Sequence, residues 1–393
     1  MNPKKGKGAD IRRSSSTAGY RVCFPFVGDS LGGSHLSSLE MIIKLRELGV
    51  DVVIVLHQSG PVEEEVRRLG LDYRILFISE MYRGVPRNVI DGVGLLFTIL
   101  KLGLFCKKEC IDIVHTNDGR AHVTWALTSL VFFLTHIWHQ RTVLFKSRVV
   151  EFLLRRARTI ICISQFVKQS IPPNLSSKCV VIPNLVGNLR VDQTQSRMIR
   201  GQFVSDPTDI QRENLIGTFG NLTEIKDPLT IVHAFCLCFH ELQDRAVLCY
   251  FGEDRGNYHE QIHKVASGYG LEENVLFRDF QRPVAPWMSA CDLVLAPSVC
   301  DAFGRTILEA MKLGVPVIAA DAGGHRELIK NREDGLLVEP GNPNAMAAAI
   351  VRTLHDAQFR QTLIANGKKK MKSEYDPASI VPKIETVYSR IAG

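Results

Sequence analysis

Short runs rich in valine and isoleucine alternate with segments of helical length along most of the chain, and this alternation constrains the fold more than any other feature. The runs include YRVCFPFV, DVVIVLH, TIICIS, NLIGTFG, AVLCYFG and DLVLAPS, and amphipathic segments such as SHLSSLEMIIKLRELG separate them. Short strands that are separated by helices form βαβ units and therefore parallel sheets. The sequence predicts an α/β protein.

A polar stretch interrupts the alternation once and divides the chain. Residues 189–213 carry little apolar periodicity and include an Asp-Pro step, so we interpret residues 196–213 as an interdomain linker. The length of 393 residues suits two domains. We therefore predict two doubly wound domains, residues 20–195 and 214–370, that face each other across a cleft. Ligands of such sheets bind beyond the carboxyl ends of the strands.

The charge balance is basic, and part of the excess lies at the start of the chain. The net charge is +7, and residues 1–19 contribute a cluster of basic side chains. These are Lys4, Lys5, Lys7, Arg12 and Arg13. The segment lacks the apolar core of a secretory signal, so we expect a solvated, disordered tail or, alternatively, a segment attracted to anionic lipid head groups. The ten cysteines show neither a disulfide framework nor zinc-ligand spacing, which favours reduced thiols in the cytoplasm.

Two apolar segments bear on membrane attachment. VTWALTSLVFFLTHIW, residues 123–138, is shorter than the ~18–20 residues that cross a bilayer. We interpret it as a buried helix that runs into a strand, with a membrane span as the alternative. VGLLFTILKLGLFCKK, residues 93–108, has basic residues at its end. A core helix is the favoured interpretation, and a helix that lies on a membrane surface is the alternative.

The stretch CDAFGRTILEAMKLGVPVIAADAGGHREL, residues 300–328, follows a predicted strand and contains an acid, a Phe-Gly pair, a second acid eight residues after the first, an apolar run and a Gly-Gly pair. GRTILEAMKLG is predicted to be a helix whose first free N–H groups can bind an anion or a hydroxyl. Asp301 precedes this helix and Glu309 lies more than one turn inside it, so an elongated polar ligand could contact both carboxylates. Taken alone, the two acids fit better as a turn former and a solvated helix charge.

The same stretch resembles the donor-binding motif of family 4 glycosyltransferases, which have the GT-B architecture of two Rossmann-like domains. The motif combines an acid, a Phe-Gly step, a Glu eight residues after the first acid, a Gly-x-Pro-Val-Ile strand and a Gly-Gly turn. The matching residues here are Asp301, Phe303, Gly304, Glu309, the run from Gly314 to Ile318, Gly323 and Gly324. The resemblance extends over most of the chain from about residue 20. It implies that a terminal helix within residues 371–393 crosses back to the N-terminal domain.

Further matches follow the family's order and spacing. Gly32 and Gly33 resemble the glycine loop that faces the donor phosphates and the acceptor. DIVHTN, residues 112–117, resembles a strand end with an Asp-x-x-His motif. FGNLTEIKDP resembles the loop that supplies basic groups to the diphosphate, with Lys226 in the lysine position. Two further family positions are Ser164 and Asn184.

The resemblance also implies the reaction and the roles of the residues. The family transfers a sugar from a nucleotide-diphosphate sugar with retention of anomeric configuration, and we expect no metal, cofactor or protein nucleophile. Glu309 would hold the ribose hydroxyls, and Asp301 with the backbone of Phe303 to Arg305 would hold the transferred sugar. Lys226 would neutralise the negative charge that develops on the leaving diphosphate.

The predicted catalytic residues are Asn117, His139, Lys226, Asp301 and Glu309. The predicted donor-binding residues are Gly33, Asn221, Lys226, Asp301, Phe303, Gly304, Arg305, Thr306 and Glu309. Contacts with the acceptor or the transferred sugar are predicted for Gly32, Asn117, His139 and Arg141.

Three positions depart from the family pattern. Asp301 stands where relatives usually carry Glu, Asn221 where many carry an Arg beside the diphosphate, and Asn117 where many carry a His. Arg305 could supply the missing cation, or it could be a surface arginine that packs on a neighbour. His115 fits a structural, hydrogen-bonded histidine. Within WHQR, residues 138–141, the histidine and the arginine resemble a polar pair that some relatives direct into the cleft, with a satisfied strand-end histidine as the alternative.

Other classes of protein fit the sequence less well. A nicotinamide dehydrogenase needs a G-x-G-x-x-G turn, and GDSLGG lacks that spacing. A nucleotide-sugar epimerase of the same fold and a non-catalytic nucleotide- or carbohydrate-binding protein stay open as alternatives. A nucleic-acid partner is not expected, because basic residues interleaved with aromatics are missing.

The expected partners are therefore a nucleotide-sugar donor and a glycan, lipid-linked or small-molecule acceptor. We expect a role in surface polysaccharide or glycoconjugate biosynthesis. The expected location is the cytoplasm, with peripheral contact at the inner face of the membrane as an extension of that prediction.

Overall fold

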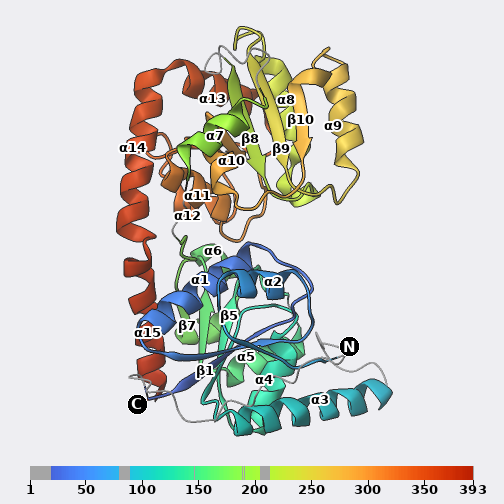
Figure 1. Cartoon of the computed structure of the whole chain (residues 1–393), viewed down its shortest axis with the longest axis vertical. Helices are drawn as coiled ribbons and strands as arrows, with labels where there is room; N and C mark the ends of the chain where they lie inside the picture. The colour runs from blue at the N-terminus through green and yellow to red at the C-terminus, as the bar shows by residue number, and fades with distance from the viewer. Residues whose placement is uncertain are drawn as a thin grey trace. The chain divides into compact units, whose positions relative to one another are not determined.

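The computed structural model describes residues 19–78, 89–145, 147–187, 189, 191–203 and 213–392. The chain divides into two compact units (Figure 1). Unit 1 comprises Met1–Cys162, Gln169–Ile182 and Val381–Gly393, and unit 2 comprises Ile163–Lys168 and Pro183–Ile380. Each unit is described below by itself. The basic segment 1–18, on which the predicted tail falls, lies outside the described residues.

The division between the units falls at a different place from the linker that the sequence suggested. It follows Ile182, whereas we placed the linker at residues 196–213. Part of that stretch is helical, because α7 spans Gln193–Arg200 and its N-terminus is capped by Asp192, which accepts a hydrogen bond from the Thr194 N–H. Residues 204–212 lie outside the described residues.

Unit 1 is built on a seven-stranded sheet among the described residues, in the order β3-β2-β1-β4-β5-β6-β7. All of its strand pairs are parallel. The strands are β1 (Arg21–Phe26), β2 (Asp51–Leu56), β3 (Tyr73–Ile75), β4 (Ile113–Thr116), β5 (Thr135–Gln140), β6 (Thr159–Cys162) and β7 (Cys179–Val181). The helices are α1 (Gly33–Glu47), α2 (Pro61–Arg68), α3 (Val89–Lys108), α4 (His122–Val131) and α5 (Arg148–Arg156), with a 3₁₀ segment at Pro173–Lys178.

Unit 2 contains a six-stranded parallel sheet within the part of the chain described, in the order β10-β9-β8-β11-β12-β13. The strands are β8 (Asn214–Phe219), β9 (Ala246–Phe251), β10 (Val275–Arg278), β11 (Leu293–Ala296), β12 (Val317–Ala320) and β13 (Leu336–Val338). The helices that follow α7 are α8 (Pro228–Cys238), α9 (Tyr258–Ser267), α10 (Ala285–Ser289), α11 (Arg305–Leu313), α12 (His325–Leu328), α13 (Pro343–His355) and α14 (Ala357–Glu374). Short 3₁₀ segments lie at Glu224–Lys226 and Glu272–Asn274.

Two helices contain residues of both units. These are α6 (Gln165–Gln169) and α15 (Pro377–Ala392). The later part of α15 is buried in unit 1, where the Tyr388 side chain has no exposed surface and its hydroxyl is hydrogen bonded to His115. The last turns of the chain therefore form part of the core of unit 1.

The strands are buried because their residues are apolar on both faces. The burial pattern of β9, AVLCYF, is buried throughout, as is that of β11, LVLA. Helices cover both faces of such a sheet, so its strands are near-continuous apolar runs. The predicted α/β class and the two doubly wound, Rossmann-like domains are confirmed.

The strand order fixes where each unit can bind a ligand. In both sheets the chain first builds outward on one side of the first strand and then returns to the other side. The reversal lies between β1 and β4 in unit 1 and between β8 and β11 in unit 2. Ligands of such sheets bind where the order reverses, beyond the carboxyl ends of the strands. We call these two places the unit 1 switch point and the unit 2 switch point.

The two apolar segments noted in the sequence are ordinary elements of unit 1. Residues 123–138 form most of α4 and the first part of β5, as predicted. No helix among the described residues has the length and apolar character needed to cross a membrane. Residues 93–108 lie in α3, which buries one side, including Leu102 and Cys106, and exposes apolar residues on the other. The core interpretation of this helix is therefore correct for one of its sides only.

Candidate functional site

The unit 2 switch point brings together the loops that follow β8 and β11. The first loop carries Lys226 at the end of a 3₁₀ turn, and the second carries Asp301 just before α11. The Lys226 Nζ donates a hydrogen bond of 2.6 Å to the Asp301 Oδ2. Both residues line a solvent-open pocket with Asn221, Gly304, Thr306 and His325, among others. This group includes several of the predicted donor-binding residues.

Asp301 is held as a carboxylate by its neighbours. Burial alone would raise its pKa, but hydrogen bonds from His325 and Lys226, together with the lysine charge, lower the pKa well below its usual range. The His325 Nε2 lies 3.8 Å from Oδ2, and the Phe303 N–H donates to Oδ1 at 3.2 Å. The backbone N–H of Phe303, which we expected to face the sugar, is therefore bonded to Asp301 in this structure.

The Gly-Gly turn of the motif exists because two backbones pack directly against each other. The Gly324 N–H donates to the Asp301 carbonyl at 2.8 Å. A Cβ on Gly323 would lie 2.5 Å from that carbonyl oxygen, and Gly323 also has a φ of +53°. A Cβ on Gly324 would lie 2.8 Å from the Ala302 carbonyl oxygen. Larger residues at either position would push away the loop that positions Asp301.

The helix α11 begins at Arg305 after Gly304, whose φ is +100°. A Cβ on Gly304 would lie 2.9 Å from the His325 ring, so the residue is needed for both its conformation and its size. Glu309 lies inside the helix and is buried. The Arg305 Nε donates to the Glu309 Oε1 at 2.6 Å. Arg305 thus contacts the acid predicted to bind ribose, and the structure does not show it replacing a cation at position 221.

The two remaining family positions of this region have structural contacts. The Asn221 Oδ1 accepts a hydrogen bond of 3.3 Å from the Glu253 N–H, which joins the loops after β8 and β9. The Ser164 Oγ donates to the Ala302 carbonyl at 2.7 Å. The Glu327 carboxylate accepts hydrogen bonds of 2.7 Å from the Gln165 and Phe166 N–H groups at the start of α6. The Ser164 hydrogen bond thus contacts the loop that carries Asp301.

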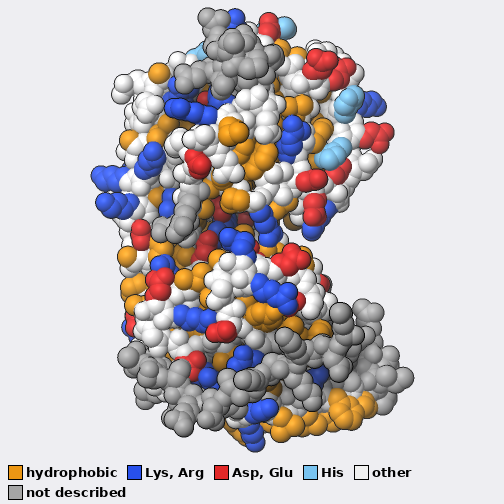
Figure 2. All heavy atoms as spheres, in the orientation of Figure 1, with side chains coloured by type: hydrophobic (Ala, Val, Ile, Leu, Met, Phe, Trp, Pro, Cys, Tyr) orange, Lys and Arg blue, Asp and Glu red, His pale blue; other side chains and the backbone are white. Residues whose placement is uncertain are grey.

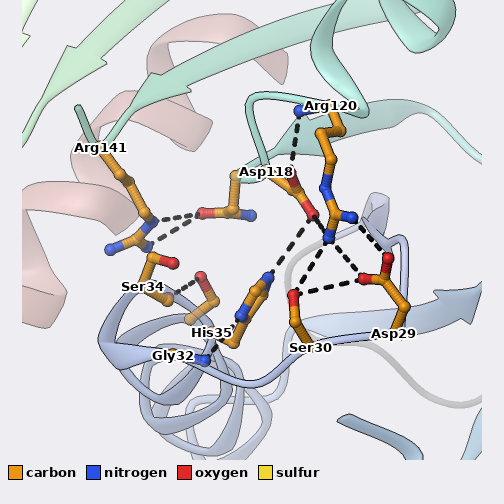
Figure 3. Close-up of polar contacts among 10 residues, drawn as sticks. Asp29, Ser30, Gly32, Ser34, His35, Asp118, Arg120 and Arg141 are labelled. Atoms are coloured by element: carbon orange, nitrogen blue, oxygen red, sulfur yellow. Dashed lines mark hydrogen bonds and ion pairs between the residues drawn. The ribbon is translucent and has the colours of Figure 1, made fainter. Parts of the chain in front are cut away.

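The unit 1 switch point holds an ion cluster from the loops after β1 and β4 (Figure 3). The guanidinium of Arg120 donates to both carboxylate oxygens of Asp29, each at 2.6 Å. Asp118 lies on the other side of this arginine, with its Oδ2 3.4 Å from Nη2. Hydrogen bonding to Arg120 lowers the pKa of Asp29. The bidentate pair ties the two loops together.

Gly32 and Gly33 lie where the glycine loop was predicted, at the start of α1. Gly32 is the residue that precedes the helix, and its N–H donates to the His35 Nδ1 at 3.0 Å. Because Nδ1 accepts this bond, the ring proton of neutral His35 is on Nε2, which lies 3.5 Å from the Asp118 Oδ2. His35 therefore links the glycine loop to the ion cluster, as Figure 3 shows.

Asn117, His139 and Arg141 also lie close together in unit 1. The Arg141 Nη2 donates to the Asn117 Oδ1 at 3.0 Å, and all three side chains are buried. The His115 Nε2 and the His139 Nδ1 are 3.0 Å apart. The Tyr388 hydroxyl is bonded to the His115 Nδ1. The predicted structural role of His115 agrees with these contacts.

Tyr388, His115, His139 and Arg141 form a series of hydrogen bonds. The two end residues determine which group donates in each bond. Arg141 can only donate, and its Nη2 lies 3.5 Å from the His139 Nδ1. Burial raises the pKa of Tyr388, so its hydroxyl keeps its proton. The tyrosine then donates to the His115 Nδ1, the His115 Nε2–H donates to the His139 Nδ1, and the His139 Nε2 carries a proton. This Nε2 is buried and has no hydrogen-bond partner among the described residues.

Five buried histidines of unit 1 are held in the neutral form. Burial lowers the pKa of His57 to about 4 and the pKa of His122 and His136 to about 3. Burial also lowers the pKa of His115 and His139 well below the usual value, and the charge of Arg141 acts in the same direction. These five histidines, which we call the histidine cluster, therefore act as neutral hydrogen-bonding groups at neutral pH.

Sequence reasoning missed Asp29, His35, Asp118 and Arg120. Asp29 lies in the glycine-rich turn GDSLGG, and Asp118 and Arg120 directly follow the DIVHTN motif, so each was adjacent to a segment already singled out. Their proximity follows from the pairing of β1 with β4. That pairing was the signal that could have found them, because the carboxyl ends of paired parallel strands lie side by side.

The two Rossmann-like domains and their switch points have the arrangement of the GT-B fold. Two family descriptions match the chain: Glycosyltransferase Family 4 over residues 31–187, and Glycosyl transferases group 1 over residues 204–370. The chain belongs to this family of glycosyltransferases.

Individual relatives cover most of the chain at low identity. It is 24% identical over 380 residues to a D-inositol 3-phosphate glycosyltransferase of Corynebacterium glutamicum, with 86% of each chain covered. It is 22% identical over 375 residues to a UDP-Gal:alpha-D-GlcNAc-diphosphoundecaprenol alpha-1,3-galactosyltransferase of Escherichia coli, which covers 91% of this chain and 94% of the relative. The solved structure of Anabaena HepE in complex with UDP and glucose superposes with a TM-score of 0.80 at 21% identity, over 94% of this chain and 100% of that one. The structural likeness establishes the same fold.

Proposed function

We propose that the chain transfers a sugar from a nucleotide-diphosphate sugar to an acceptor hydroxyl with retention of anomeric configuration. The observation that carries this proposal is the Lys226–Asp301 pair at the unit 2 switch point, beside the first turn of α11. A lysine ammonium, a carboxylate and a helix N-terminus together match the diphosphate and the hydroxylated sugar of such a donor. The complexes of Anabaena HepE with UDP and with UDP-glucose support a uridine nucleotide as the donor class to test first.

Lys226 acts on the leaving group. Its side chain is 38% exposed, so a diphosphate that enters from solvent can reach the ammonium that contacts Asp301. Negative charge grows on the phosphate oxygen as the bond to the sugar breaks. Because this interaction strengthens toward the transition state, Lys226 contributes to the rate as well as to binding.

Asp301 and Glu309 recognise hydroxyl groups at opposite ends of the donor. The low pKa of Asp301 keeps it ionised, and it accepts hydrogen bonds from the transferred sugar. Glu309 lies one helical turn after Arg305 in α11 and accepts from the ribose hydroxyls, with Arg305 holding its carboxylate in place. The one methylene that separates Asp from the usual Glu at position 301 is offset by the contacts of Lys226 and His325 with this carboxylate.

The transfer needs no protein nucleophile. The bond between the anomeric carbon and the phosphate oxygen breaks, and the acceptor oxygen bonds to the anomeric carbon on the same face. The proton of the acceptor hydroxyl passes to the departing phosphate oxygen. In unit 1, the His139 Nε2–H, which has no partner among the described residues, donates to an oxygen of the acceptor, and Asn117 and Arg141 hold the adjoining groups.

The acceptor and the pathway that we propose rest on the names of the relatives more than on the geometry of the site. The names of the relatives include a diphosphoundecaprenol-linked sugar and an inositol phosphate as acceptors. We therefore propose a lipid-linked or small hydroxylated acceptor, in surface polysaccharide or glycoconjugate biosynthesis. The two non-transferase alternatives, an epimerase of the same fold and a non-catalytic binding protein, are distinguished by the experiment that follows.

The test begins with the thermal shift of the full chain in a panel of nucleoside diphosphates and nucleotide sugars. Any stabilising sugar nucleotide is then incubated with the protein, with and without acceptors, and NMR reads the anomeric configuration of the product. We expect slow donor hydrolysis alone, faster transfer with an acceptor, retained configuration, and unchanged rates in a metal chelator because Lys226 supplies the positive charge. Inverted product, donor epimerisation without transfer, or binding without turnover would each overturn the proposal.

A further inference from the structure

An apolar stripe runs along the outer side of α3 in unit 1. Its members recur at three- and four-residue spacing, which places them on one side of a helix. They are Val93, Leu96, Phe97, Leu100 and Leu104. Phe97 is 69% exposed and Leu104 is 63% exposed. Figure 2 shows hydrophobic side chains gathered at the edge of the molecule where Figure 1 places α3.

The end of α4 extends this surface. The side chain of Phe132 packs at Gly103 of α3, where a Cβ would lie 2.1 Å from its ring, so the two helices meet at this point. The next residue, Phe133, is 95% exposed and has a φ of +55°. A bulky residue rarely adopts this conformation, which costs of order 1 kcal/mol or more. The fold thus holds an aromatic ring in solvent at an energetic cost, which is typical of a surface kept for binding.

The charge of this surface is uniformly basic. Residues 92–108 and 129–145, which supply the exposed apolar side chains of α3 and the end of α4, contain no Asp or Glu. Lys101, Lys107 and Lys108 are exposed on α3, and the Lys107 ammonium lies 5.4 Å from the centre of the Phe132 ring. A stripe of Leu and Phe with lysines beside it matches the boundary between the acyl chains and the anionic head groups of a bilayer.

The start of β1 contacts the residues that follow the lysine-bearing end of α3. The chain enters β1 at Arg21, whose guanidinium donates to the Glu109 carbonyl at 2.6 Å, immediately after the last residue of α3. The Arg21 N–H donates to the Asp112 carboxylate. Residues 1–18, which precede this strand in the sequence, contain five basic residues and one acid.

We propose that the exposed apolar residues of α3, with Phe133 and the flanking lysines, form a docking surface for a membrane that contains anionic phospholipids. We call it the α3 surface. A second protein copy would need an acidic counterpart to these lysines, whereas an anionic bilayer supplies both the apolar layer and the negative charge. The helix lies in the plane of the interface. This inference goes beyond the proposed reaction and does not depend on it.

Flotation of the full chain with lipid vesicles tests the α3 surface. One set of vesicles is pure phosphatidylcholine, and the other contains about 30% phosphatidylglycerol, so the two differ mainly in charge. We expect binding to the anionic set, weaker binding when salt is raised about fivefold, and little binding to the neutral set. The double variant Phe97→Ser, Leu104→Ser should reduce the anionic partition coefficient by about tenfold or more.

Two further variants separate membrane binding from folding. Phe133→Gly relieves the left-handed backbone, so it should keep or raise the melting temperature while it lowers vesicle binding. Phe280→Ser removes a partly exposed aromatic residue of unit 2 and serves as the matched control, with binding unchanged. The proposal is overturned if the wild-type chain does not float with anionic vesicles, or if the α3 variants bind as well as Phe280→Ser. It is also overturned if light scattering shows a dimer that the double variant dissociates, because the surface would then belong to a second copy.

Discussion

The two switch points occupy equivalent places in two sheets of the same strand order, yet they hold their cations differently. In unit 1, Arg120 is bonded through two nitrogens to Asp29 and also lies beside Asp118, so one cation faces two carboxylates. In unit 2, Lys226 contacts the single carboxylate of Asp301. Arginine forms a rigid bidentate fork, whereas lysine is a mobile point charge.

This difference separates a scaffold from a binding group. Moving Arg120 away from its partners breaks several charge-assisted hydrogen bonds at once, so the unit 1 cluster fixes two loops. Lys226 is partly exposed and has one carboxylate partner at this switch point, which suits the contact with an incoming diphosphate that we propose. The same topology thus provides two equivalent positions, and we propose that only the unit 2 position binds the anionic part of a substrate.

The largest expected difference between the two units is in their stability toward acid. The pKa of each of five buried histidines in unit 1 is lower in the folded protein than the usual 6.5. Below pH 6.5 the unfolded chain therefore binds more protons, and stability falls as the pH drops toward the folded pKa values. At pH 5 each of His57, His122 and His136 lowers the free energy of unfolding by about 2 kcal/mol, and His115 and His139 act in the same direction. We expect unit 1 to unfold at a higher pH than unit 2.

Tryptophan fluorescence can measure the pH at which each unit unfolds. The chain has three tryptophans, with Trp125 and Trp138 in unit 1 and Trp287 in unit 2. A Trp287→Phe variant reports on unit 1, and a Trp125→Phe, Trp138→Phe variant reports on unit 2. A single shared midpoint in both variants would show that the histidine cluster does not determine acid stability.

Lys226→Met should have the next largest effect. It removes the charge that faces the leaving diphosphate, so the rate constant at saturating donor should fall by more than about 100-fold. Nucleoside affinity should hardly change, because base and ribose lie away from the lysine. The matched control is Lys330→Met, which changes an exposed lysine of the same unit that pairs with Glu333. An equal loss in both variants would contradict a specific role for Lys226.

Glu309→Gln should weaken binding more than catalysis. A hydrogen bond to a charged group contributes about 1.5–3 kcal/mol, so nucleoside and donor affinity should fall roughly ten- to a hundredfold. Isothermal titration with nucleoside and with nucleoside diphosphate measures both. If the nucleoside responds to Lys226→Met and ignores Glu309→Gln, then the donor lies in the opposite direction along α11.

Tyr388→Phe tests the hydrogen-bond chain that ends at His139. The change removes the donor to the His115 Nδ1 and leaves this buried nitrogen unpaired, which costs about 1–3 kcal/mol. We expect a several-fold loss in the rate constant and a change in the nitrogen chemical shifts of His139, since its tautomer is no longer imposed. A stability loss with unchanged His139 shifts would assign Tyr388 to packing alone.

Asp29→Asn should have the smallest effect and fall on unit 1 only. The pair with Arg120 is partly exposed, so we expect a loss of about 1 kcal/mol in the free energy of unfolding. Donor affinity should stay constant. Glu47→Gln removes an exposed ion pair with Lys44 and is the control, with an expected loss of about 0.3 kcal/mol. A large fall in donor affinity for Asp29→Asn would show that the cluster is a binding group after all.

The sequence predicted the elements better than the contacts, for a physical reason. Strands and helices follow from local periodicity, and residues 123–138 divided into α4 and β5 as expected. Lys226 and Asp301 were assigned to one site from motif resemblance, although 75 positions separate them. The ion cluster of Asp29, Asp118 and Arg120 was not predicted, because it depends on which strands are neighbours. The Arg305–Glu309 contact was within reach, since the two residues are four apart on one helix.

Most of α15 belongs to unit 1, and this has a consequence for synthesis of the protein on the ribosome. Unit 1 emerges first, but the side chains of Ile384 and Tyr388 that complete its core are made only after all of unit 2. During translation, His115 therefore lacks its hydrogen-bond partner Tyr388 while the sheet of unit 2 is made. The core of nascent unit 1 is therefore incomplete, and chaperone binding to ribosome-bound chains should persist until α15 has left the exit tunnel.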